Sequence, residues 1–84
     1  MWKINYEAQA VKFLKKSDHQ LQKKILKFLD KLRENPKLSG KSLTGNLKGL
    51  WRYRVVDYRI ICNLEEKEIT ILVIEIGHRS EVYK

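Results

Sequence analysis

Residues 50–78 read LWRYRVVDYRIICNLEEKEITILVIEIGH, and they contain the strongest secondary-structure signals of the chain. It contains three runs rich in β-branched and aromatic residues, and a charged turn of about four residues separates the last two runs. Runs of this length and composition are typical of strands, and short connections between them are typical of antiparallel neighbours. The stretch therefore predicts an antiparallel β-meander.

The residues before the meander predict one strand and two helices. Residues 2–6, WKINY, alternate apolar and polar side chains with the period of a half-buried strand. In residues 7–16 and 21–32 the apolar side chains recur at three- and four-residue spacing, as in amphipathic helices. Residues 36–49 carry three of the four glycines and predict a loop.

The ends of the second helix carry their own signals. Ser17 or Asp18 is expected to cap its start, and Asn35-Pro36 is expected to stop it. The predicted architecture is α+β, with an N-terminal strand, a two-helix hairpin and then the antiparallel meander. Both helices are expected to pack on one face of a single sheet of about four strands, in one domain covering residues 1–84.

The net charge of +8 is unevenly distributed along the chain. Residues 1–50 contain 12 basic and 4 acidic residues, whereas residues 51–84 contain 6 of each. Such an excess suits a polyanionic partner, either nucleic acid or an acidic protein segment. Lysines of the two predicted helices are the candidates for phosphate contact, although each alone is equally typical of a solvated surface. They are Lys12, Lys15, Lys16, Lys23, Lys24, Lys27 and Lys31, and Lys48 in the loop is added as a further substrate-binding candidate.

Other functional classes receive little support. No stretch approaches the roughly 18 apolar residues of a membrane span, and the first ten residues lack the pattern of a signal peptide. Cys62 is the only cysteine, which excludes an internal disulfide and a cysteine-based zinc cluster and fits a reducing cytoplasm. Its apolar neighbours predict a packed thiol rather than a reactive one.

Three arginines are expected to meet on the meander. Arg52 and Arg54 share one face of their strand because side chains alternate, and Arg59 follows the short turn into the next strand. Three cations on one patch repel one another unless an anion joins them. The patch is therefore either a salt-bridged structural cluster, for which the carboxylates of Asp57, Glu75 and Glu81 are available, or a site for an oxyanion.

Two segments carry a family resemblance, WRYRVVDYR at residues 51–59 and GHRSEVY at residues 77–83. Together with the basic helical hairpin, they resemble the RelE branch of the RelE/ParE toxin superfamily over nearly the whole chain. The resemblance implies the toxin of a type II toxin–antitoxin pair that cleaves messenger RNA on the ribosome, without metal or cofactor. It also implies a cognate antitoxin, with operator DNA bound by the complex through that antitoxin.

Carried over by position, the family's functional side chains fall on six residues: Arg52, Arg54, Arg59, His78, Arg79 and Tyr83. The best-known RelE branch has lysines at the first pair. Arginines preserve phosphate binding there but not proton transfer, because arginine remains protonated. The resemblance thus assigns phosphate binding to the arginines and leaves proton transfer to Tyr83 or His78.

Tyr83 becomes a base only if neighbouring cations lower its pKa from about 10. Histidine is better suited to proton transfer near neutral pH, but His78 can equally be a residue that leaves the sheet after Gly77 and bonds to backbone. Two other functions stay open. One is a ParE-like toxin that poisons DNA gyrase, against which HRSEVY argues, and the other is a basic nucleic-acid-binding module without activity.

Overall fold

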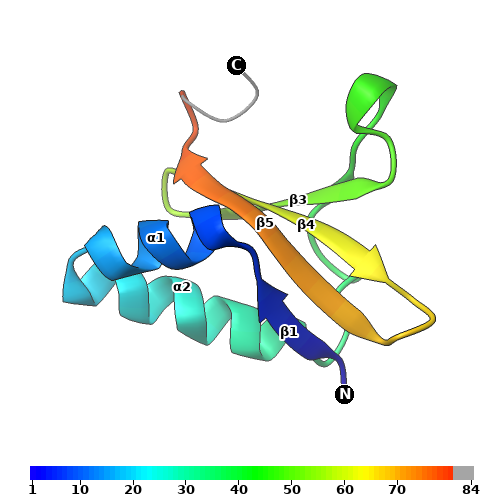
Figure 1. Cartoon of the computed structure of the whole chain (residues 1–84), viewed down its shortest axis with the longest axis horizontal. Coiled ribbons are helices and arrows are strands. Elements are labelled where there is room, and N and C mark those ends of the chain that lie inside the picture. The colour runs from blue at the N-terminus through cyan, green and yellow to red at the C-terminus, as the bar shows by residue number, and fades with distance from the viewer. Residues whose placement is uncertain (81–84) are drawn as a thin grey trace.

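The computed structural model describes residues 1–80 as two helices and a five-stranded sheet (Figure 1). The elements in chain order are β1 (Lys3–Tyr6), α1 (Ala8–Lys16), α2 (His19–Leu32), β2 (Lys41–Ser42), a 3₁₀ turn (Gly45–Leu47), β3 (Leu50–Val55), β4 (Tyr58–Glu65) and β5 (Thr70–His78). The strand order across the sheet is β1-β5-β4-β3-β2. The predicted α+β class and element order are confirmed.

The meander forms as the sequence predicts, with β4 antiparallel to both β3 and β5. β1 lies at one edge and runs parallel to β5. The sheet has five strands rather than about four, because β2 forms within the predicted loop and pairs with Arg52 and Trp51 of β3. A two-residue strand is too short to show periodicity in a sequence, so the pattern could not reveal it.

Both helices are set by local signals at their ends. The Asp18 carboxylate accepts a hydrogen bond from the Leu21 N–H at 2.9 Å, which makes Asp18 the N-cap of α2. Ser17 instead ends α1, and its hydroxyl donates to the Phe13 carbonyl at 2.8 Å. α2 ends at Leu32, shortly before the predicted stop at Asn35-Pro36.

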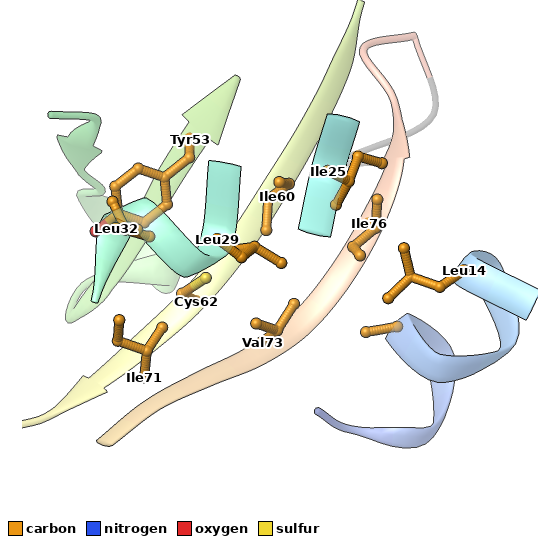
Figure 2. Close-up of a cluster of buried hydrophobic side chains, with 11 residues drawn as sticks. Leu14, Ile25, Leu29, Leu32, Tyr53, Ile60, Cys62, Ile71, Val73 and Ile76 are labelled. Atoms are coloured by element: carbon orange, nitrogen blue, oxygen red, sulfur yellow. The ribbon is translucent and has the colours of Figure 1, made fainter. Parts of the chain in front are cut away.

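The core lies between the helices and one face of the sheet (Figure 2). Leu14 of α1 and Ile25 and Leu29 of α2 face buried side chains of the three central strands. The buried strand residues are Tyr53, Ile60, Cys62, Ile71, Val73 and Ile76. The prediction that the helices cover one face is confirmed, and no helix of the described chain covers the other face of the sheet.

Tyr53 also fixes the loop that follows α2. Its side chain is buried, and its hydroxyl donates a hydrogen bond to the Pro36 carbonyl. Gly40 has a φ of 76°, and a Cβ there would lie 2.6 Å from the Tyr53 ring. Only glycine fits both conditions. This contact holds the chain beside β3 just before β2 begins.

A β-bulge changes which side chains of β5 face the helices. Cys62 pairs with Val73 and Ile61 pairs with Glu75, so Ile74 is the extra residue. Val73 faces the core before the bulge and Ile76 faces it afterwards. His78, two residues beyond Ile76, therefore lies on the helix side of the sheet.

Candidate functional site

The arginines of β3 point away from the helices. They alternate with Tyr53, whose ring lies 5.9 Å from that of Phe28 in α2. Arg54 pairs directly with Arg59 of β4 across the antiparallel ladder. Side chains directly opposite in such a ladder share a face, so Arg52, Arg54 and Arg59 lie on the uncovered face of the sheet.

The end of β5 brings a fourth arginine to the same region. Gly77 pairs with Arg59, and the Arg79 N–H donates to the Asp57 carbonyl at 2.9 Å. That bond continues the pairing of β5 one residue past its last regular position. Arg79 is exposed beside the turn that joins β3 to β4. We call Arg52, Arg54, Arg59 and Arg79 the arginine face.

Carboxylates neutralise this charge very little. Within residues 1–80, the one acidic contact of the arginine face is between Arg54 Nη2 and Asp57 Oδ1 at 4.0 Å, and both side chains are more than half exposed. Arg54 Nε also donates to the Val56 carbonyl at 2.9 Å. Glu75 forms no ion pair with any described residue, and Glu81 lies outside the described part of the chain. Among residues 1–80 the arginine face is therefore largely unneutralised, and its role as a site for an anion stays a prediction.

Lys41 is a further cation on this face that sequence reasoning missed. It belongs to β2 and pairs directly with Arg52. Lys41, Arg52 and Arg54 line a shallow hollow of about 270 Å³ along the edge of β3. Because β2 leaves no periodic signal, nothing in the sequence separates Lys41 from the other loop residues.

His78 lies apart from the arginine face. Its ring is 5.6 Å from that of Tyr58 and nearly perpendicular to it, and the Tyr58 ring is 5.6 Å from that of Phe13 in α1. His78 Nδ1 contacts the Ser80 hydroxyl at 2.9 Å and accepts from the Ser80 N–H at 3.3 Å. These contacts fit the alternative in which His78 forms only local hydrogen bonds, here with Ser80. Its catalytic role stays a prediction.

The remaining predicted site residues are not gathered with the arginines. The candidate lysines of α1 and α2 are exposed on the helices, which cover the other face of the sheet, and Lys48 is exposed between the 3₁₀ turn and β3. Tyr83 lies outside the described residues. The structure thus joins Arg52, Arg54, Arg59 and Arg79 and separates them from the helix lysines and from the His78 ring.

Buried titratable groups on the core side do not suit catalysis. Burial raises the pKa of the Cys62 thiol to about 12, and it also raises the pKa of Tyr53. Neither side chain carries charge near neutral pH, so both serve as core residues. The prediction of a packed thiol at Cys62 is confirmed.

A family profile matches the sequence over residues 4–83, and its description is the ParE toxin of the type II toxin–antitoxin system parDE. The chain belongs to this toxin family. No curated protein sequence matches the toxin closely enough to count as a relative.

Solved structures of RelE toxins share the fold of this toxin. The toxin–antitoxin complex RelBE2 from Mycobacterium tuberculosis contains a chain with a TM-score of 0.85 and 22% identity, covering 93% of the toxin and 98% of that chain. The intact RelBE complex of E. coli gives 0.81 and 18%, with coverage of 93% and 96%. The archaeal RelE–RelB complex from Pyrococcus horikoshii OT3 gives 0.76 and 25%, with coverage of 96% and 98%.

These findings support the resemblance drawn from the sequence. The protein is a RelE-like toxin of the RelE/ParE superfamily, and the three structures compared above are complexes with an antitoxin. None of the helices in residues 1–80 is long and apolar enough to cross a membrane.

Proposed function

We propose that the toxin is a ribosome-dependent endonuclease that cleaves messenger RNA and so inhibits translation. The observation that carries the proposal is the arginine face, three arginines of β3 and β4 and one directly after β5, with only one loose carboxylate contact in the described chain. Cations that a protein leaves unpaired on one surface are suited to bind an anion. Phosphodiesters of RNA supply such an anion.

The proposed reaction uses the RNA's own 2′-hydroxyl. The 2′-oxygen attacks the adjacent phosphorus as it loses its proton, and the bond from phosphorus to the 5′-oxygen breaks as that oxygen gains a proton. The products are a 2′,3′-cyclic phosphate and a 5′-hydroxyl. Arg52, Arg54 and Arg59 stabilise the extra negative charge of the phosphorane, and Arg79 binds the phosphate or the leaving oxygen.

Proton transfer is the part that the arginines cannot perform, because guanidinium groups stay protonated. We assign the base to Tyr83, with His78 as the alternative or assisting group. The rate of such a nuclease increases most when a second macromolecule holds the RNA in a reactive geometry. The ribosome is therefore proposed as the partner that orients the message.

The basic helices suit the other proposed partners. Exposed lysines on α1 and α2 can contact phosphates of ribosomal or messenger RNA, and the cognate antitoxin is proposed to carry an acidic or amphipathic segment. Operator DNA is proposed to be bound by the complex through the antitoxin. All of these partners belong to the cytoplasm.

A second candidate is a toxin that poisons DNA gyrase, and it is favoured by the description of the matching family, which names ParE. Two parallel assays separate the candidates. One is a translation reaction with and without the toxin, read by mapping messenger 5′ ends, and the other is supercoiling by gyrase. Message cleavage with normal supercoiling supports the endonuclease, whereas lost supercoiling with intact message supports the gyrase poison.

A further inference from the structure

β5 is much longer than the strand that pairs with its outer edge. β1 pairs residues Lys3–Tyr6 with Thr70–Val73, and the last backbone contact runs from the Glu7 N–H to the Val73 carbonyl at 2.9 Å. The chain then turns into α1, while β5 continues to His78 (Figure 1). On this edge, the second half of β5 has no strand partner among the described residues.

The side chain of Gln9 takes the place of that missing strand. Gln9 Nε2 donates to the Ile76 carbonyl at 2.9 Å, and Gln9 Oε1 accepts from the Ile76 N–H at 2.9 Å. A neighbouring strand would satisfy the same two backbone groups in this paired manner. Gln9 sits in the first turn of α1, so the amide ties the end of β5 to a helix anchored in the core by Ala10 and Leu14.

We propose that Gln9 is a positioning residue for the arginine face, holding the end of β5 so that Arg79 stays beside Asp57 and Arg59. The value of that position rests on the proposed function, in which Arg79 contacts the reacting phosphate. The end of a strand frays easily, and Gly77 adds backbone freedom just before Arg79. An arginine that stabilises a transition state must be in place beforehand, because ordering it during the reaction lowers the rate.

Substitution of Gln9 by methionine tests the proposal, because methionine keeps the length of the side chain and removes both hydrogen bonds. The matched control is Gln22→Met. Gln22 Nε2 also donates one side-chain bond to a backbone carbonyl, that of Leu14 at 2.9 Å, but this bond joins α2 to α1 and does not involve β5. Gln9→Glu is the graded variant, because it keeps an acceptor for the Ile76 N–H and loses the donor.

Hydrogen exchange gives the direct readout. In Gln9→Met the amides of Ile76 and Arg79 are expected to exchange roughly tenfold faster than in wild type, with Gln9→Glu between them and Gln22→Met unchanged. Unchanged exchange at Arg79 in Gln9→Met overturns the proposal, whether or not the toxin cleaves RNA.

Cleavage kinetics test the functional part. With an active wild type, Gln9→Met should lower kcat while leaving KM nearly unchanged, and Gln22→Met should change neither. Full activity of Gln9→Met in spite of faster exchange at Arg79 contradicts the positioning role. If the wild type itself cleaves no message, the proposed function fails, and the exchange at Arg79 still decides whether Gln9 holds the strand.

Discussion

Removal of the Arg59 side chain separates a binding role from a structural one. Arg59 is half-buried at the centre of the arginine face, opposite Arg54 on one side and Gly77 on the other. Within residues 1–80 it forms neither an ion pair nor a side-chain hydrogen bond. Arg59→Ala therefore removes no ion pair or side-chain hydrogen bond of the described chain and relieves repulsion with Arg54, so the free energy of unfolding should change by less than about 0.5 kcal/mol.

The effect on the reaction should be much larger. A charge-assisted hydrogen bond contributes about 1.5 to 3 kcal/mol, which corresponds to a loss of about ten- to 150-fold in rate. The assay is single-turnover cleavage of ribosome-bound message, with thermal unfolding measured on the same preparations. Lys67→Ala is the matched control, because it removes one positive charge from the exposed turn between β4 and β5, at the other end of the hairpin.

The control should cleave at the wild-type rate, which separates a local role of Arg59 from a general effect of net charge. Wild-type cleavage by Arg59→Ala would refute its assignment to the phosphate. A large drop in thermal stability would show instead that Arg59 supports the fold, and the reasoning from its unpaired position would be wrong.

Four other expectations follow from the structure. Lys41→Ala should reduce cleavage severalfold without loss of stability, because Lys41 adds charge beside Arg52; single-turnover kinetics at low and high salt check this. Tyr83→Phe should sharply reduce cleavage across the pH range while leaving ribosome binding unchanged, whereas a greater loss in His78→Gln, with wild-type activity that falls as pH drops, would move the proton transfer to His78. Burial raises the pKa of Cys62 from 9.0 to about 12, so the unfolded chain loses the thiol proton at a lower pH than the folded chain. The contribution of the Cys62 thiol to the free energy of unfolding should therefore be complete below about pH 9 and be lost as the pH rises toward 12. Urea titrations should show a smaller loss over this pH range in Cys62→Ala. Binding of the antitoxin should weaken as salt rises, because the helices carry most of the exposed lysines; an affinity that does not change with ionic strength would indicate an apolar interface.

Most of the fold could be predicted because its signals are local and repeated. The apolar spacing of α2 and the three strand runs each extend over several residues, and the structure confirms them. The cap of α2 is a local signal directly before the helix, and of the two candidates the structure selects Asp18. The pairing of Arg54 with Arg59 also follows from the sequence, because the turn between their strands is short and side chains alternate.

Single-residue features account for what the sequence could not predict. The bulge at Ile74 lies inside the run ILVIEI, where every position but one is apolar, so no alternation marks the change of face that places His78 with Tyr58. β2 is too short to show a period, which hides Lys41 from the pattern. The hydrogen bonds of Gln9 join residues 67 positions apart, and one polar side chain in an amphipathic helix predicts no such partner.

The mapping of messenger 5′ ends in a translation reaction shows whether the toxin is a ribosome-dependent endonuclease. The toxin is added to ribosomes translating a defined message and, separately, to the same message as naked RNA, with Arg59→Ala run beside the wild type. New 5′-hydroxyl ends are expected only with ribosomes and wild-type toxin, and few or none with Arg59→Ala. Equal cleavage of naked RNA would contradict the dependence on the ribosome, and an intact message under both conditions would contradict the endonuclease itself.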